Sequence, residues 1–268
     1  MTQEHSPIRE TAHQALAHMG LEAINRLYDI SITDESMSHV QSVTEAIENN
    51  SDFSLIMYAN HIANSDGAFI LWLYRQYIAP NGQRKLIVPA SISHLDKAVD
   101  PLGARVLPIA ASLFGIDLAA VVQTYYVGKD YSEAEAMGTY RALMTKIRSS
   151  RPCDVMIFPE GHRTENENRG LQKGESGIVK IARALRPVVL LPIGIIPQEG
   201  TKRTNIPARL GFGGEFSRGV NLGEAFRLEV GEGILVQQGE HADLDKLMIG
   251  LARLLPDDMR GEYPVQEL

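Results

Sequence analysis

The sequence predicts an α/β fold, in which a mixed, mostly parallel central sheet is flanked by helices and preceded by a short helical extension. From Phe53 onward, short apolar runs alternate with longer stretches whose apolar residues recur at helical spacing, a rhythm typical of βα units. The chain has 268 residues, of which 44% are hydrophobic and 22% charged. This composition supports one large core and excludes a disordered chain.

Residues 1–50 are predicted to form the N-terminal helical extension, and residues 51–268 the main domain. Residues 8–30 repeat apolar groups at helical spacing, and Thr33 or Asp34 is a suitable N-cap for a second helix. The polar run 49–52 then interrupts the pattern. We therefore expect the extension to pack on the main domain without forming a second catalytic unit.

The main domain is predicted to contain five strands and five helices. The expected strands are 53–58, 85–88, 121–127, 155–158 and 188–195, and the expected helices are 68–78, 101–114, 132–148, 175–185 and 242–255. The Gly- and Arg-rich stretch 201–223 is expected to be irregular and to end in a strand near Val220. The apolar run 187–197 is too short for a membrane-spanning helix and contains three prolines, so a strand buried on both faces is expected.

Charge and cysteine content narrow the function classes. Lys and Arg total 26 against 33 Asp plus Glu, a net charge of -7, whereas a nucleic-acid binder would normally be basic. The single cysteine, Cys153, cannot form an internal disulfide, which suits the cytoplasm. Residues 1–10 lack the basic start and apolar run of a signal peptide, so a cytoplasmic location is expected.

A histidine and an aspartate five residues apart follow the first strand of the main domain. The segment is Asn60-His61-Ile-Ala-Asn-Ser-Asp66. A carboxylate against one imidazole nitrogen fixes the tautomer and stabilises the imidazolium, so the pair suits general-base chemistry. Positions five apart on one helix do not face each other. The two side chains can therefore meet only if the chain turns between them, with Asp66 in the first turn of the helix; otherwise Asp66 only caps the helix.

A second polar cluster follows the strand predicted at 155–158. Pro159 ends the strand, and Gly161 permits a sharp turn that presents Glu160, His162 and Arg163 at the same sheet edge as His61. An arginine fork at this edge suits a phosphate or a carboxylate. The alternative is a surface ion pair between Glu160 and Arg163, which would contribute little.

Together the two motifs resemble the glycerolipid acyltransferase superfamily, which includes glycerol-3-phosphate and 1-acylglycerol-3-phosphate acyltransferases. The pattern is Asn-His-x4-Asp, followed about a hundred residues later by Phe-Pro-Glu-Gly-x-Arg-Thr. Further similar segments are the Lys-Gly pair at 173–174, the proline-containing apolar strand at 188–195, the turn at 220–226 and the ending at 254–263. The resemblance covers about residues 53–263, in the family's order and spacing.

The resemblance implies roles for particular residues. His61 would be the general base and Asp66 its orienting partner, and the acceptor hydroxyl itself would attack, without a covalent acyl-enzyme. Arg163, with Glu160, Gly161, Lys129 and Lys173, would bind the acceptor. The donor would be acyl-CoA or acyl carrier protein, and the acceptor a glycerol-phosphate or a lysophospholipid. The resemblance implies no metal ion and no nucleotide cofactor.

The sequence departs from the family pattern at three places. His162 stands where the family usually has Thr, and Lys129 follows the strand where an arginine is common; lysine neutralises phosphate but lacks the bidentate fork. The membrane-embedded N-terminal segment of many members is missing, as in the soluble plastid-type enzymes. A peripheral contact with the inner membrane face remains an expectation.

Two other functions stay open at this point. A thioesterase or another acyl hydrolase would use the same His–Asp pair with water in place of the alcohol, and a non-catalytic lipid- or phosphate-binding module would need no base. His94 and Asp96 could form a second acid–base pair or, with His61 and Asp66, a metal site; the alternative, that they are polar loop residues, is favoured because no tight ligand cluster accompanies them. The basic residues of the stretch 201–223 contact anionic lipid or an acidic acyl carrier protein, or form a solvated loop; they are Lys202, Arg203, Arg209 and Arg218.

Overall fold

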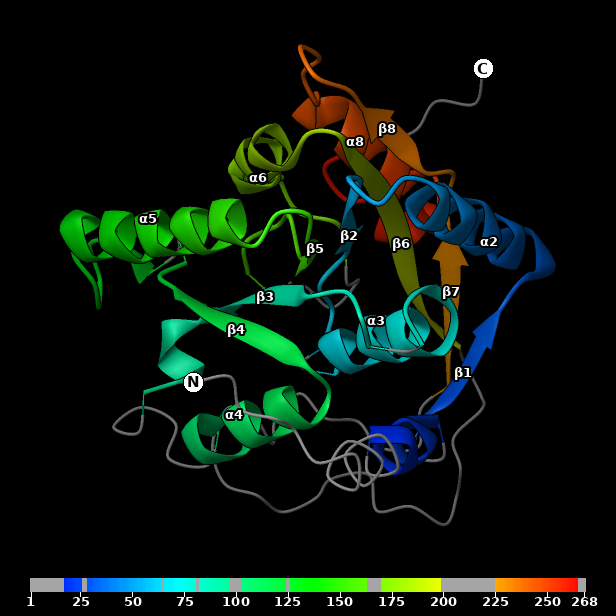
Figure 1. Cartoon of the computed structure of the whole chain (residues 1–268), viewed down its shortest axis with the longest axis horizontal. Coiled ribbons are helices and arrows are strands. Elements are labelled where there is room, and N and C mark those ends of the chain that lie inside the picture. The colour runs from blue at the N-terminus through cyan, green and yellow to red at the C-terminus, as the bar shows by residue number, and fades with distance from the viewer. Residues whose placement is uncertain are drawn as a thin grey trace.

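The computed structural model has one central sheet with helices on both faces (Figure 1). It describes residues 17–25, 28–63, 65–80, 82–96, 103–123, 126–162, 170–198 and 225–264. Within these ranges the sheet has eight strands in the order β1-β7-β6-β2-β5-β3-β4, with β8 paired to β6. The α/β class predicted from the sequence is confirmed.

The strands are mostly parallel. Parallel pairs join β1 to β7, β2 to both β6 and β5, and β3 to both β5 and β4, whereas β7 and β8 run antiparallel to β6. Their bounds are β1 Asp29–Ile32, β2 Ser54–Ala59, β3 Leu86–Ser91, β4 Ile116–Val121, β5 Asp154–Ile157, β6 Val188–Gln198, β7 Ala225–Val230 and β8 Ile234–Val236.

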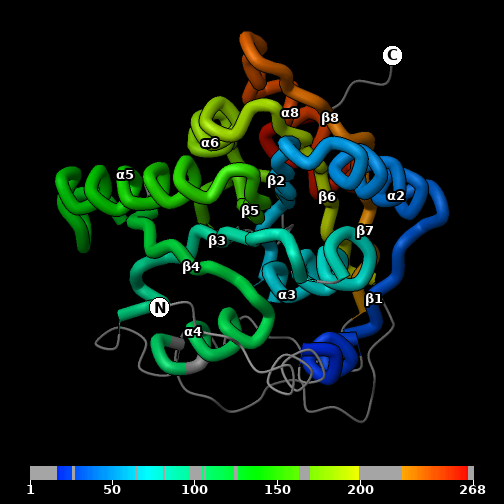
Figure 2. Tube along the Cα trace, viewed as in Figure 1, coloured from blue at the N-terminus to red at the C-terminus, as the bar shows by residue number. Residues whose placement is uncertain are grey.

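Helices connect the parallel strands and cover the two faces of the sheet. They are α2 Asp34–Asn49, α3 Asp66–Leu73 with its continuation η1 Tyr74–Ile78, η2 Ile92–His94, α4 Gly103–Leu113, α5 Glu133–Ser149, α6 Gly177–Leu185, α8 Leu244–Ala252 and η4 Asp257–Met259. The connections through α3 and α4 step across the sheet in one direction, and those through α5 and α6 step in the other. Because such crossovers are right-handed, the two helix pairs lie on opposite faces; Figure 2 shows α4 apart from α5 and α6.

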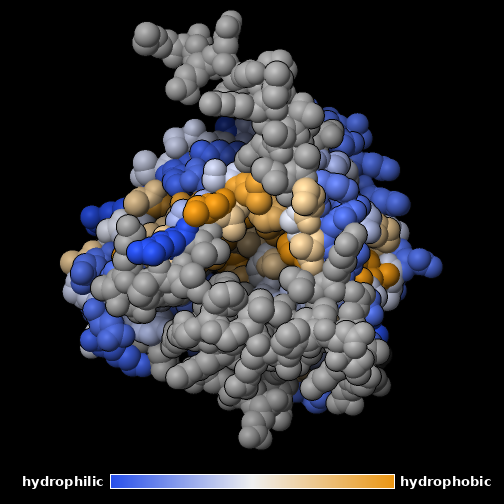
Figure 3. All heavy atoms as spheres, turned by 90° about the horizontal axis from the view of Figure 1, so that it is seen from below, coloured by the Kyte–Doolittle hydropathy of each residue, from blue (hydrophilic) through white to orange (hydrophobic). Residues whose placement is uncertain are grey.

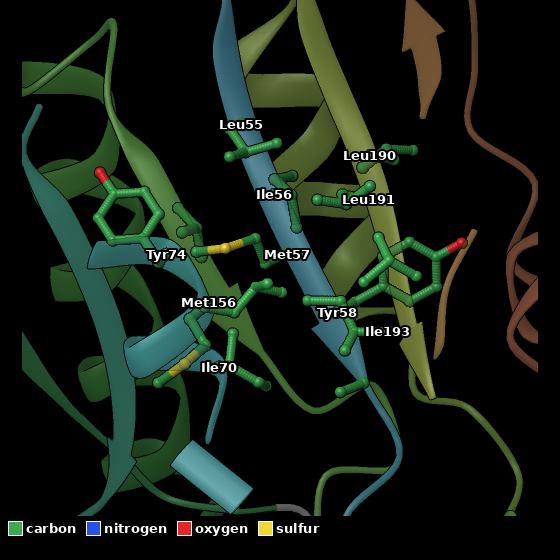
Figure 4. Packing of buried hydrophobic residues seen from close by; sticks show 14 of the residues in the cluster. Leu55, Ile56, Met57, Tyr58, Ile70, Tyr74, Met156, Leu190, Leu191 and Ile193 are labelled. Carbon is green, nitrogen blue, oxygen red and sulfur yellow. The ribbon is translucent and has the colours of Figure 1, made fainter. Parts of the chain in front are cut away.

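The core forms where the two central strands meet the helices. Every residue of β2 is buried, and β6 is buried over its first nine positions, as expected for strands covered on both faces. Figure 4 shows Leu55, Ile56, Met57 and Tyr58 of β2 beside Leu190, Leu191 and Ile193 of β6, with side chains of α3, η1 and β5 packed against them. This core holds the C-terminal ends of β2 and β5 in place.

The sheet opens between β3 and β5. These strands pair only at Leu86 with Asp154 and at Ile87 with Val155, whereas β3 pairs with β4 as far as Ser91. Pro89 lies two residues beyond the last pair with β5 and has no N–H to donate to a ladder. The sheet therefore divides toward the C-terminal ends of β3 and β5, and this opening shapes the site described below.

Most predicted elements are found, and two predictions are wrong. The strand predicted at 121–127 lies at Ile116–Val121, because Gly115, with φ +63, ends the preceding helix and the chain extends at once. The helical pattern predicted over 8–30 extends into β1 at residues 29 and 30, where Asp-Ile-Ser-Ile alternates polar and apolar residues with period two. The expected strand near Val220 lies outside the described residues.

The predicted division at residue 50 stays a prediction. Residues 17–25 are helical, β1 pairs with β7 in the sheet, and Val40, Val43 and Ile47 of α2 belong to the main core. Among the described helices, none has both the length and the apolar composition that a membrane crossing requires.

Candidate active site

The histidine and aspartate of the first motif meet at the C-terminal end of β2. Nδ1 of His61 lies 3.0 Å from Oδ2 of Asp66. Asp66 is the first residue of α3, and His61 lies in the loop before it, so the predicted turn between them is confirmed. Because the carboxylate accepts a hydrogen bond, Nδ1 carries the proton, which leaves Nε2 as the nitrogen that can take a proton from a substrate.

The loop is built around the Asp66 carboxylate. Its Oδ2 also accepts hydrogen bonds from the backbone N–H groups of Ile62, at 2.6 Å, and Ala63, at 2.8 Å. Asp66 is fully buried, and within the described part of the chain its Oδ1 has no hydrogen-bond partner. One carboxylate oxygen therefore both folds the loop and orients the imidazole, so the pair is preorganised.

Two neighbouring side chains position the histidine further. The buried Asn60 side chain donates to the carbonyl of Ile195 and accepts from its N–H, at 3.0 and 2.7 Å, which ties the end of β2 to β6. The ring of Phe158, which follows β5, stacks on the imidazole of His61 with the centroids 4.2 Å apart and the planes 14° apart. The imidazole is thus held at its edge by Asp66 and across its face by Phe158.

Glu160 joins the two motifs from inside the protein. Its side chain is buried, and its two oxygens accept hydrogen bonds from the backbone N–H groups of His61, at 2.7 Å, and Gln172, at 2.8 Å. Burial raises the pKa of Glu160 to about 8, although the two N–H donors act in the opposite direction. Gly161 follows with φ +73, a conformation that favours glycine, and its N–H closes the turn onto the carbonyl of Phe158.

An apolar pocket opens beside this pair. It has a volume of about 470 Å³ and lies where β3 and β5 part. Figure 3 looks at the molecule from below and shows a central hollow with hydrophobic (orange) residues inside it and along its upper edge. The walls include Val88 and Ala90 from β3, Met156 from β5, and side chains of four helices: Ala68 and Leu71 of α3, Leu107, Ala110 and Ala111 of α4, Tyr140 and Leu143 of α5, and Ile178 and Ile181 of α6. His61 lines the same pocket.

The lining suits a hydrocarbon tail and not a phosphate. Among the described residues, no lysine or arginine lines the pocket, and its polar side chains include His61, Ser91, His94 and Gln123. An apolar pocket with a few polar groups at one place is the usual form of a small-molecule site.

The structure brings some predicted site residues together and places others apart. His61, Asp66, Glu160 and Gly161 form one connected unit. Lys129 and Lys173 are exposed and do not line the pocket. Arg163 lies outside the described residues. Nδ1 of His162, the residue found in place of the family's Thr, lies 3.1 Å from the carbonyl of Glu160.

Sequence reasoning missed two residues of the site. Phe158 and Gln172 belong to it through a ring stack and a backbone N–H. His94, expected to be a loop residue or part of a second polar site, lines the pocket. The sequence signal that could have indicated Phe158 and His94 is their location, since both follow strands of the parallel sheet. Within the described residues, no group of three or more His, Cys, Asp or Glu side chains is arranged to hold a metal ion.

The site thus combines a buried carboxylate, an oriented imidazole and an adjoining apolar pocket. No curated protein matches the chain. The model of the protein family described as Acyltransferase matches residues 39–196, more than half of the chain and a range that includes both motifs. The chain belongs to the acyltransferase family.

Proposed function

We propose that the protein transfers a fatty acyl group from an acyl thioester to the hydroxyl of a glycerol-phosphate-type acceptor, with His61 as general base. The observation that carries the proposal is the His61–Asp66 pair on the wall of an apolar pocket. The resemblance supplies the acceptor class, glycerol-3-phosphate or a lysophospholipid, and the donor class, acyl-CoA or acyl carrier protein.

The chemistry follows from the positions of these groups. The acyl chain lies in the pocket, so that its thioester carbonyl is next to His61. Nε2 takes the proton of the acceptor hydroxyl while its oxygen attacks the carbonyl carbon, and Asp66 stabilises the imidazolium that forms. When the tetrahedral intermediate collapses, the C–S bond breaks and the proton passes from His61 to the departing thiolate. The products are an ester and a free thiol.

The acceptor's phosphate would lie outside the pocket. Arg163, Lys129 and Lys173 are proposed to contact it, as the family resemblance implies. Glu160 has a different proposed role, because both of its oxygens are used by backbone N–H groups. We assign it as a positioning residue that holds the loop of His61 against the segment around Gln172.

The proposal is tested by incubating the purified protein with labelled acyl thioesters and a panel of acceptors, and by identifying the products by mass. We expect an acylated acceptor, little free fatty acid, and loss of product in a folded His61→Ala variant. His241→Ala is the matched control, because His241 is exposed and outside the pocket. Fatty acid release that no acceptor diverts would identify a hydrolase, and full transfer by His61→Ala would remove the mechanism.

The remaining predictions on location and partners are tested separately. If the protein is cytoplasmic and rests on the inner membrane face, it should co-sediment with vesicles. Detergent should not be needed to bring it into solution. No nucleic-acid partner is expected, given the net charge of -7.

A further inference from the structure

The outer faces of α5 and α6 carry a basic surface on an otherwise acidic chain. Segments 136–153 and 176–198 contain no Asp or Glu, although the whole chain has a net charge of -7. We name as the α5–α6 basic surface six cations of these segments that are exposed or half-buried: Arg141, Arg148, Arg151, Lys180, Arg183 and Arg186. Lys146, the remaining cation of the two segments, is not included because it pairs with Asp117.

Contacts between the two helices make this surface continuous. The helices pack against each other, and the Lys180 ammonium lies 5.6 Å from the ring centroid of Tyr140 on α5. Burial raises the pKa of Tyr140, and the nearby positive charge of Arg148 opposes that shift. Arg151 donates a hydrogen bond to the carbonyl of Arg186. The cations of α5 and of α6 therefore lie side by side, as the helices do in Figures 1 and 2.

Within the described part of the chain, no carboxylate neutralises the charge of this surface. Among the described residues, none of the six cations forms an ion pair with a carboxylate. The acidic residue that approaches is Glu240, whose backbone carbonyl accepts from Arg186 while its carboxylate accepts from the N–H of Gln237. Clustered like charges repel one another unless a partner of opposite charge binds, so the surface fits an anionic partner.

The same two helices form a wall of the pocket. Tyr140 and Leu143 on the inner side of α5, and Ile178 and Ile181 on the inner side of α6, line the cavity that holds His61. The cations of the basic surface stand at exposed or half-buried positions on or beside the same helices and do not line the pocket. A partner bound there would contact the helices that form this wall.

We propose that the α5–α6 basic surface docks an acidic acyl carrier protein, which makes a carrier-bound thioester the physiological donor; this inference rests on the proposed acyl transfer. The extent of the surface favours a protein. Arg141 and Arg148 are about 10 Å apart along α5 at about 1.5 Å per residue, and the cations continue across a second helix. A helix face that inserts into a lipid surface also exposes large apolar side chains, and Met137 is the one such residue exposed on the described parts of α5 and α6.

The test uses charge reversal away from the catalytic groups. The variant Arg148→Glu/Arg183→Glu is compared with Arg148→Gln/Arg183→Gln, which removes half as much charge, and with Arg105→Glu on α4 as control. Binding of unacylated carrier protein is measured at low and high salt, and kcat/KM is measured with acyl-carrier and with acyl-CoA donors. Thermal melting verifies that each variant is folded.

We expect the reversal variant to lose about tenfold or more in carrier binding and in kcat/KM for the acyl-carrier donor at low salt, because steering by surface charge is of that size. The neutral variant should lose less, high salt should weaken wild-type binding, and acyl-CoA turnover should not change. Equal loss with acyl-CoA, or loss only of binding to anionic vesicles, would overturn the docking proposal. Absence of transfer with both donors in the wild type would instead refute the proposed function.

Discussion

The substitution Asp66→Asn separates the two roles of the Asp66 carboxylate. In the wild type, Oδ2 accepts from two backbone N–H groups and from Nδ1 of His61. An asparagine oxygen can replace Oδ2, because an amide placed the other way would set its NH₂ against the N–H groups of Ile62 and Ala63. The loop and the histidine tautomer are then kept, and only the negative charge is lost.

The expected effect follows from the distance. Unit charges 3.0 Å apart attract by about 5 kcal/mol at an effective dielectric constant of about 20. This attraction exists only once His61 has taken the proton, so its loss raises the barrier to the chemical step. We expect kcat to fall by about 10³- to 10⁴-fold, with a small change in Tm. Asp66→Ala should behave differently, because it also leaves two N–H groups without an acceptor, at about 1–3 kcal/mol each.

The assay is steady-state acyl transfer with a fixed thioester, together with thermal unfolding of wild type, Asp66→Asn and Asp66→Ala. If Asp66→Asn retains more than about a tenth of the wild-type kcat, the imidazolium is not a species that Asp66 stabilises, and the general-base assignment is wrong. If both variants unfold alike, the loop is held by contacts other than the Oδ2 hydrogen bonds.

Three further predictions follow from the site. Since burial raises the pKa of Glu160 from 4.5 to about 8, its contribution to stability is full below about pH 4.5 and is lost as the pH rises through 8; urea midpoints across this range should fall in the wild type, and Glu160→Gln should remove that part of the slope. Each acyl-chain methylene that enters the pocket should raise kcat/KM about fourfold, from about 0.8 kcal/mol per CH₂, until the cavity is full. Ala110→Leu narrows the pocket and should move the optimal acyl-chain length toward shorter chains. An unchanged optimal length would place the acyl chain elsewhere. Gly161→Ala should lower stability by about 1–2 kcal/mol, because φ is +73 and a Cβ would lie 3.1 Å from Cγ of Glu175, and a variant with unaltered Tm would show that the turn relaxes.

Local patterns were sufficient for most elements and for the central pair of the site. The βα rhythm predicted the class of fold, since strands buried on both faces and amphipathic helices have distinct periods. The five-residue interval between His61 and Asp66 required a turn at the start of a helix, and that is where Asp66 lies. Elements were misplaced where a pattern was short, as at β1, or where a glycine shifted a boundary, as at Gly115.

The role of Glu160 shows the limit of local reasoning. An exposed glutamate beside an arginine suggests a substrate contact, and the tertiary structure instead buries it against two backbone N–H groups from distant segments. Neither segment alone shows that its backbone N–H group will donate a hydrogen bond to a side chain far away in the sequence. The stacking of Phe158 on His61 is hidden for the same reason.

By itself, the sequence determined the α/β class and the turn that brings His61 and Asp66 together, because both depend on residues close together in the chain. Which strands are neighbours, and where β3 and β5 separate to leave an apolar pocket, depended on the tertiary structure. The physical reason is that an internal cavity is bounded by side chains from many elements, and its size is set by the packing of all of them at once.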